Sequence, residues 1–210
     1  MSKLNFAKID TLEIDTMIAS GRHIRIGVIS PEDGEKMREG ISKMSPQSRY
    51  YRFFSGADEQ PDHVIDRLTS VDGVSHFAWG ALDCDQPGAP AIAAVHAMRT
   101  ETDQPMEFSV VVLDDYQGEG VSKLLSAMLF AQCLVHGEQT LVAHVLEENR
   151  RSKTFITHLG GTRQSADGHV VEYRIDVAAA LLSMRDADVV GKQPVVEAIT
   201  PYLSYFEGSA

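Results

Sequence analysis

Short runs of apolar residues, several of them alternating with polar residues, predict β-strands along the chain. In the segment 23–29, Ile24, Ile26 and Val28 recur at every second position and would share one face of a strand. The Val-rich segment 106–113 is continuously apolar, which predicts a strand buried on both faces. Further strands are expected over 76–83, 91–98, 141–146 and 170–175, with a Pro-Gly turn at 84–90 that predicts a hairpin.

Apolar residues spaced three or four positions apart predict helices in other segments. The clearest helix begins at Val121 and ends before Gly137. A second begins after Ser30 and a third after Asn149, because both residue types cap helix N-termini well. Helices are also expected over 61–68, 177–184 and 194–206, the last interrupted by Pro201, whereas residues 1–22 show no clean period.

The order of these elements predicts the fold class. A run of strands precedes one strand-loop-helix-strand-helix unit, which indicates a mixed α/β fold with a twisted, partly antiparallel sheet flanked by helices. A length of 210 residues favours one domain with extensions. The expected division is an N-terminal extension 1–22, a domain 23–184 and a C-terminal helical extension 185–210. That last extension could cover a sheet edge or make a contact in a homodimer.

A glycine-containing loop between the Val-rich strand and the long helix is the strongest chemical signal. It reads DYQGEG from Asp115 to Gly120 and opens a helix, where N–H groups and the helix dipole favour an anion such as phosphate. The loop is not a Walker motif, because no Gly-Lys-Ser/Thr follows it, and it is not G-x-G-x-x-G, because Val121, Ser122 and Lys123 follow Gly120. An ordinary strand-to-helix connection, in which glycines relieve crowding, explains the loop equally well.

Three segments together resemble the GNAT N-acetyltransferase superfamily. QGEGVS at 117–122 is similar to the Gln/Arg-x-x-Gly-x-Gly/Ala acetyl-CoA loop, and NRRSKTFITHLG at 149–160 to the Asn-led helix that follows the next strand. SPQSRYYRFF at 45–54 resembles the GNAT module of bacterial protein-lysine acetyltransferases. The resemblance covers about residues 23–175. It implies a GNAT-type sheet and transfer of an acetyl group from acetyl-CoA to an amine, either a protein lysine or a small molecule.

The resemblance also implies which residues hold the cofactor. The backbone of Val110, Val111 and Val112 would pair with the pantetheine arm, and Asn149 would contact that arm near the reacting end. Backbone N–H groups of the loop would hold the pyrophosphate. The loop residues are Gln117, Gly118, Glu119, Gly120, Val121, Ser122 and Lys123. Arg150, Arg151 or Lys153 could meet a further phosphate, or could be solvated helix surface.

Two residues are candidates for removing the proton that an attacking amine must lose. A lysine-like amine has a pKa of about 10.4 in water, so a carboxylate or imidazole is expected near the thioester. Glu107 stands at the start of the Val-rich strand, where the resemblance places a glutamate base. His144 is the alternative: it could relay a proton, or could be a hydrogen-bonded core residue.

Two departures from the family pattern motivate a second hypothesis. Ile156 stands where many members carry a tyrosine acid, and Ser122 where Gly or Ala is usual. The alternative function is a catalytically weak or inactive module that keeps the acyl-CoA pocket as a sensor. In the aromatic segment 45–54, Phe53 and Phe54 are expected to close one end of the sheet, while Arg49 and Tyr50 could border the acceptor channel.

The composition limits which classes of binding partner are expected for this chain. The chain has 19 Lys and Arg against 30 Asp and Glu, a net charge of −11, which disfavours nucleic acid and suits amine substrates. No stretch approaches the roughly 20 apolar residues of a membrane span, and the N-terminus does not resemble an export signal, so a cytoplasmic protein is expected. Cys84 and Cys133 lack metal-binding spacing and are expected as buried thiols, without a metal site.

Overall fold

The computed structural model describes residues 6–55, 57 and 59–207, and eight strands within them form one mixed sheet. The strand order is β1-β2-β3-β4-β5-β6-β8-β7. Neighbouring strands are antiparallel except β5 and β6, which are parallel, so the predicted mixed, partly antiparallel sheet is confirmed. The strands are β1 (Glu13–Met17), β2 (His23–Val28), β3 (His76–Asp83), β4 (Ala91–Met98), β5 (Met106–Val112), β6 (Thr140–Leu146), β7 (Thr162–Asp167) and β8 (Val170–Asp176).

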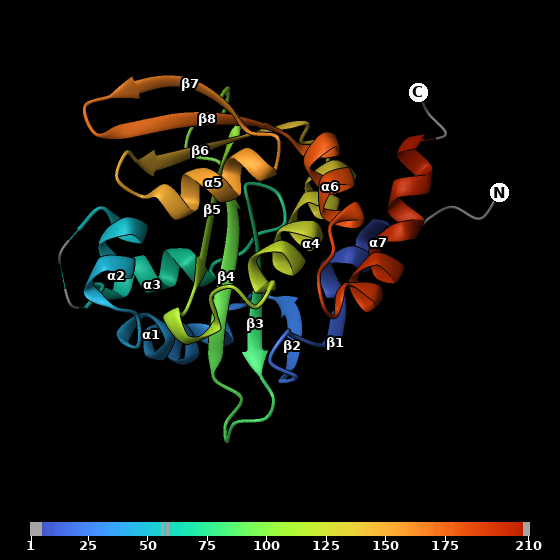
Figure 1. The fold of residues 1–210 in the computed structure, drawn as a ribbon, viewed down its shortest axis with the longest axis horizontal. Helices are drawn as coiled ribbons and strands as arrows, with labels where there is room; N and C mark the ends of the chain where they lie inside the picture. The colour runs from blue at the N-terminus through green and yellow to red at the C-terminus, as the bar shows by residue number, and fades with distance from the viewer. Residues whose placement is uncertain (1–5, 56, 58, 208–210) are drawn as a thin grey trace.

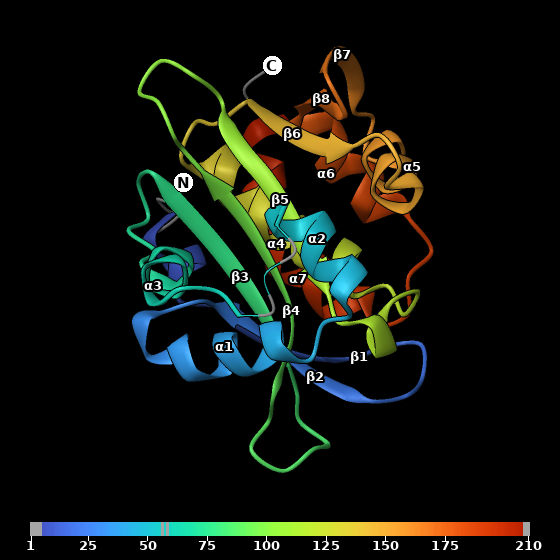
Figure 2. The ribbon, with the colours of Figure 1, turned by 90° about the vertical axis from the view of Figure 1, so that its left-hand side faces the viewer.

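Helices cover both faces of the sheet (Figures 1 and 2). One layer contains α1 (Gly34–Ser42), α2 (Pro46–Phe53) and α3 (Asp62–Thr69). On the opposite face α4 (Val121–Val135) packs against β3 and β4, with α6 (Val177–Asp186) and α7 (Lys192–Glu207) against it. The helix α5 (Arg150–His158) follows β6, and short 3-10 turns occupy Phe6–Thr11, Pro31–Asp33 and Asp114–Tyr116. None of the helices in the described ranges has the length and apolar character that a bilayer crossing requires.

The core lies between α4 and the sheet. Nearly every residue of α4 is buried, and its Phe130 ring lies 5.3 Å from the ring of Phe108 on β5. Phe77 and Trp79 on β3 are fully buried. The indole N–H of Trp79 donates to Gln132 Oε1 at 2.8 Å, which satisfies the one polar group of that side chain inside the core.

Three elements escaped the sequence pattern: β1, α2 and β7. The strand β1 lies in residues 1–22, for which no element was predicted. It is only five residues long, and it buries Ile14 and Thr16. The strand β7 is exposed at every position, so it carries no hydrophobic alternation and is defined by its pairing with β8. Helix α2 has no regular apolar stripe; Ser45 caps it, and it ends at Phe54 with φ of 53°.

Several expectations about burial and continuity are wrong. The Val run of β5 is only partly buried, because one edge of that strand faces a cleft rather than another strand. Cys84 lies exposed in the β3–β4 turn, whereas Cys133 is buried, and burial raises the pKa of its thiol. Phe54 is 45% exposed instead of closing the sheet. Helix α7 continues through Pro201.

Segments expected as extensions also contribute to this core. Ile9, Ile14 and Ile18 near the N-terminus are buried, as are Val195 and Ile199 of α7. The two segments meet where the Thr16 hydroxyl donates to the carbonyl oxygen of Gly191 at 2.6 Å. At Gly191 φ is +74°, and a Cβ there would lie 1.8 Å from the carbonyl oxygen of Met17. The contact between β1 and the start of α7 therefore requires glycine.

Replacing Gly191 tests this contact. Gly191→Ala should lower the free energy of unfolding by about 2–4 kcal/mol, because a strained backbone adds to a clash with a carbonyl oxygen. Gly88→Ala is the matched control: its φ is +78°, and nothing lies within 4 Å of the added Cβ. The control should lose about 1–2 kcal/mol in urea unfolding. Equal losses in the two variants would show that the close approach does not matter.

Candidate functional site

The strands β5 and β6 diverge beyond their two paired positions (Figure 2). A cleft lies between them. The parallel register joins only Met106 with Leu141 and Glu107 with Val142, although β5 continues to Val112. On its other side β5 stays paired with β4 as far as Val112. Beyond Glu107, the edge of β5 that faces β6 therefore has no partner strand among the described residues, and its backbone groups can pair with an extended ligand.

The cleft has a volume of about 1050 Å³ and brings the sequence candidates together. Its walls come from β5, β6, α2, the loop before α4, the first turns of α5 and the segment between α6 and α7. Every residue predicted for the cofactor or for catalysis lines it: Glu107, Val110, Val111, Val112, Gln117, Gly118, Glu119, Gly120, Val121, Ser122, Lys123, His144 and Asn149.

One end of the cleft is the glycine loop at the N-terminus of α4. Gly118 and Gly120 have φ of +88° and +90°, the left-handed region that favours glycine. Gly120 is the N-cap, and no side chain among the described residues caps the helix. Amides of the first turn are thus directed to a ligand at the positive end of the dipole. The Lys123 amide is an exception, since it donates to Gly120 O at 3.0 Å.

Basic side chains gather at the same end. Lys123, Arg150 and Arg151 line the cleft and add positive charge beside the helix terminus. Lys153 does not join them, because its ammonium group pairs with Glu147 at 2.9 Å. The loop end therefore suits a ligand with phosphate groups.

At the other end, His144 lies between two carboxylates. Its Nδ1 is 3.6 Å from Glu107 Oε1 and its Nε2 is 3.7 Å from Glu172 Oε2. Glu172 on β8 is the cross-strand partner of His144. The sequence analysis missed Glu172, because pairing between distant strands leaves no local sequence pattern. The side chains of Glu107 and His144 are 40% and 36% exposed, so both remain accessible to a ligand. The arrangement can accept or relay a proton.

Helix α2 supplies a positive charge to this carboxylate end. Arg52 lines the cleft and lies over the Phe53 ring at 5.3 Å. Burial lowers the pKa of Arg52 from its ordinary value, and the Glu107 charge opposes that shift. The open question about Arg49 has a structural answer: it is buried, and its guanidinium donates to Met44 O at 2.7 Å. Tyr50 is exposed and lies outside the cleft lining.

Asn149 and Ile156 connect α5 to the cleft. The Asn149 side-chain oxygen accepts the Ser152 amide at 3.0 Å, so this residue caps α5 as predicted. Its side-chain NH₂ group is then the part that can serve a ligand. Ile156 is buried, and an apolar side chain occupies the position where the resemblance leads one to expect tyrosine.

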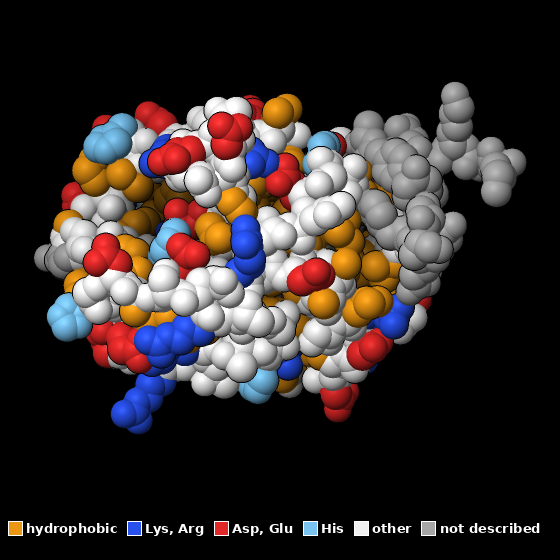
Figure 3. All heavy atoms as spheres, turned by 90° about the horizontal axis from the view of Figure 1, so that it is seen from above, with side chains coloured by type: hydrophobic (Ala, Val, Ile, Leu, Met, Phe, Trp, Pro, Cys, Tyr) orange, Lys and Arg blue, Asp and Glu red, His pale blue; other side chains and the backbone are white. Residues whose placement is uncertain are grey.

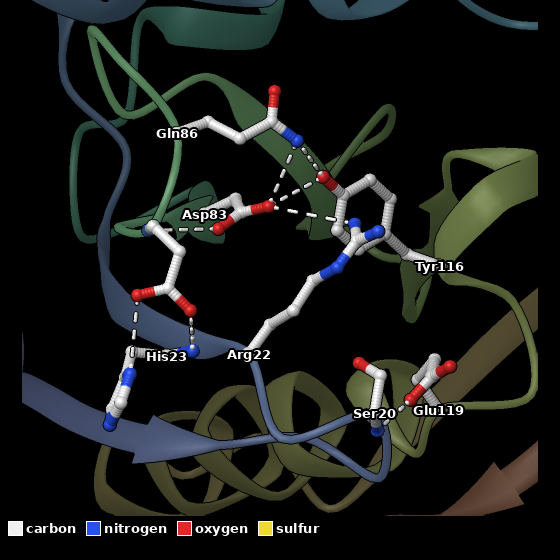
Figure 4. A network of polar contacts seen from close by, with 8 residues as sticks. Ser20, Arg22, His23, Asp83, Gln86, Tyr116 and Glu119 are labelled. Carbon is white, nitrogen blue, oxygen red and sulfur yellow. Dashed lines mark hydrogen bonds and ion pairs between the residues drawn. The ribbon is translucent and has the colours of Figure 1, made fainter.

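A buried carboxylate anchors the glycine loop from behind (Figure 4). Asp83 is fully buried and accepts hydrogen bonds from the Tyr116 hydroxyl at 2.7 Å and from Gln86 Nε2 at 3.0 Å. Arg22 lies 3.6 Å from the same carboxylate and 4.8 Å above the Tyr116 ring. Burial raises the pKa of Tyr116, and Asp83 adds to that shift. The loop is thereby tied to the turns that follow β1 and β3.

Other contributions to the cleft come from sequence-distant segments that carried no motif. Ala19, before β2, and Val189, after α6, line it. A Cβ at Gly120 would lie 2.7 Å from Val189 Cγ1, so the segment after α6 packs directly on the loop. The Glu119 carboxylate accepts the Ser20 amide at 2.6 Å, which fixes the loop to the β1–β2 turn.

The surface around the site carries charges of both signs. On the face seen in Figure 3, acidic and basic side chains are interspersed. Within the described part of the chain, no group of three His, Cys, Asp or Glu side chains could hold a metal ion.

Comparisons with known proteins agree with this geometry. No family model matches the chain. It is 26% identical over 157 residues to an acetyltransferase of Pseudomonas aeruginosa, covering 74% of this chain and 84% of that protein. It is 28% identical over 169 residues to acetyltransferase Pat of Mycolicibacterium smegmatis, covering 78% of this chain but only 49% of Pat.

Solved structures confirm the fold. The GNAT domain of S. lividans PAT superposes with a TM-score of 0.70 at 25% identity, over 78% of this chain and 96% of that domain. A spermidine N-acetyltransferase from Vibrio cholerae, solved with CoA and spermine, gives a TM-score of 0.58 at 13% identity, over 75% of this chain and 98% of that one. The second likeness concerns the fold alone.

Removing the Tyr116 hydroxyl tests the anchor of the loop. Tyr116→Phe should lower the free energy of unfolding by about 1–3 kcal/mol, because the buried Asp83 carboxylate loses a donor. Tyr202→Phe is the control: Tyr202 is also buried, and its hydroxyl has no hydrogen bond among the described residues. Chemical denaturation of both variants gives the comparison. A Tyr116→Phe loss no larger than that of Tyr202→Phe would contradict an anchoring role.

Proposed function

We propose that this chain, a GNAT-fold N-acetyltransferase, transfers an acetyl group from acetyl-CoA to a primary amine by direct attack of the amine nitrogen on the thioester. The observation that carries the proposal is the continuity of the cleft. It joins an amide-rich, basic loop end to a carboxylate–imidazole end along the unpaired edge of β5. Acetyl-CoA is an extended ligand whose phosphates need the basic, amide-rich end. Its thioester lies at the opposite end, where the acceptor amine needs a group that takes up its proton.

The loop end fits the phosphates of the cofactor. The left-handed glycines remove side chains from the approach, α4 starts without a side-chain cap among the described residues, and three basic side chains stand beside it. The exposed edge of β5 from Val110 to Val112 fits the pantetheine arm, whose amides can pair with a strand edge. A β5 amide near the reacting end would polarise the thioester carbonyl.

At the reacting end, Glu107 takes the proton from the acceptor ammonium, directly or through water. His144, held between Glu107 and Glu172, can carry the proton onward to solvent, because both its ring nitrogens face carboxylates. The leaving thiolate receives its proton from water or from another cleft group, since Ile156 supplies none.

The acceptor we favour is a lysine presented by a protein. Glu107, Glu148 and Glu172 lie in or beside the cleft and suit a cationic side chain. Tyr50 on α2 and Phe54 just after it are exposed, and Phe54 also lines the cleft, which suits contact with a protein surface. A small amine is the alternative acceptor, in keeping with the spermine bound by the Vibrio cholerae enzyme.

A second candidate function is an acyl-CoA sensor with weak or no turnover. The observation that favours it is the buried, apolar Ile156 at the position expected for the acid. The two functions share the cofactor cleft and differ in what Glu107 does.

Neutralising Glu107 separates the two functions. Glu107→Gln should reduce kcat for acetylation of a lysine-bearing protein by about 100-fold or more while leaving the Kd of acetyl-CoA unchanged, because only proton removal is lost. Glu101→Gln, an exposed glutamate outside the cleft, should behave as the parent does. Unchanged turnover in Glu107→Gln would remove this residue from the mechanism. Absence of turnover in the parent, with acetyl-CoA still bound, would favour the sensor.

Titration calorimetry with acetyl-CoA and CoA tests the cofactor site. Micromolar binding is expected for the parent chain. Gly120→Val should weaken it at least tenfold, because a side chain there is strained at φ of +90° and meets Val189. Gly73→Val, at a positive-φ glycine far from the cleft lining, controls for backbone strain and should bind as the parent does. No binding at millimolar cofactor would overturn the proposed function.

A further inference from the structure

Asp114 joins the cofactor loop to α2 on the opposite wall of the cleft. Asp114 is the first residue of the 3-10 turn Asp114–Tyr116, which follows β5. Its Oδ2 accepts the Ser45 amide at 3.0 Å and its Oδ1 accepts the Ser48 hydroxyl at 2.8 Å. The Ser45 hydroxyl in turn accepts the Ser48 amide at 3.2 Å. A single carboxylate therefore binds both serines that open α2.

Asp114 stays ionised in this position. Burial opposes ionisation of the carboxyl group, but the hydrogen bonds from Ser45 and Ser48 outweigh it and hold the pKa of Asp114 below its ordinary value. Hydrogen bonds to a charged acceptor are roughly twice as strong as those between neutral groups.

The same carboxylate also contacts the loop. Gln117 Nε2 lies 3.3 Å from Asp114 Oδ1 and donates to Val112 O at 3.0 Å, while Gln117 Oε1 accepts a hydrogen bond from Arg151. The polar network thus runs from α2 through Asp114 and Gln117 to α5. It passes along the β5 edge and the loop that the cofactor would occupy.

Helix α2 depends on such contacts for its placement. It has eight residues, and a helix of that length is marginal without tertiary contacts. It lines the cleft with Tyr51 and Arg52, and the charge of Arg52 interacts with that of Glu107. Gln47 Nε2 donates to the Tyr51 hydroxyl at 3.0 Å. Any shift of its first turn would move these two side chains relative to Glu107.

We propose that Asp114 is a positioning residue that couples cofactor binding at the loop to the placement of α2, and so of Tyr51 and Arg52 at the acceptor end. This inference rests on the proposed function, because it takes CoA as the ligand of the loop. Phosphates on the loop amides fix Gln117 and Asp114, and the two serines transmit that order to α2. The acceptor then meets a wall that the cofactor has already ordered.

Hydrogen exchange with and without saturating CoA tests the coupling. In the parent chain, CoA should slow exchange in peptides covering both the loop, 117–124, and α2, 47–54. In Ser48→Ala the loop should remain protected, whereas the protection of α2 by CoA should fall about tenfold, because one charge-assisted hydrogen bond of the bridge is lost. Ser48→Thr keeps a hydroxyl and should restore the coupling.

A control and a second variant keep the test decisive. Ser42→Ala removes an exposed hydroxyl that bonds within α1, to Glu39 O, and should leave both protections unchanged. Asp114→Asn keeps one acceptor oxygen but loses the charge and the second acceptor, so it should also weaken the protection of α2 by CoA. Equal α2 protection by CoA in the parent, Ser48→Ala and Asp114→Asn would overturn the inference. Absence of protection at the loop in the parent would instead contradict the proposed function.

Discussion

The separation of β5 from β6 is the constraint on which the rest of the site depends. Two paired positions hold the strands together, and beyond Glu107 each follows its own direction. An unpaired strand edge inside a protein normally costs stability, because backbone N–H and C=O groups lose their partners. Here the edge faces an open cleft, where water or an extended ligand can satisfy those groups. The same separation makes room for the first turns of α4 and α5.

Side chains of the glycine loop and of the turn before it are held by hydrogen bonds to other segments of the chain. Asp114 binds α2, Tyr116 binds Asp83 at the end of β3, and Glu119 binds the turn after β1. These bonds hold the loop backbone in place beside the cleft, although the amides of Gln117 and Lys123 are themselves bonded within the chain. An arrangement of this kind is preorganised, so less conformational entropy is lost when a ligand binds.

The elements that follow a regular hydrophobic period could be predicted from the sequence. The sequence also singled out the loop, Glu107 and His144, which the structure brings together in the lining of one cleft. It missed β7, whose residues are all exposed, and α2, whose placement comes from side-chain hydrogen bonds rather than an apolar stripe. The partial burial of the Val run was also missed, because a strand that lines a cleft can have the same apolar sequence as a strand buried on both faces. Partners such as Glu172 depend on pairing between distant strands, which local patterns do not record.

The packing of Val189 on Gly120 and of Gly191 on Met17 has a consequence for how the site forms during synthesis. Chains fold from the N-terminus as they emerge from the ribosome. The strands, the loop and both ends of the cleft are synthesised well before residue 189. The wall beside the glycine loop, however, is completed only when that late segment docks. A nascent chain that stops short of it would present an open loop and an uncovered apolar face of α4.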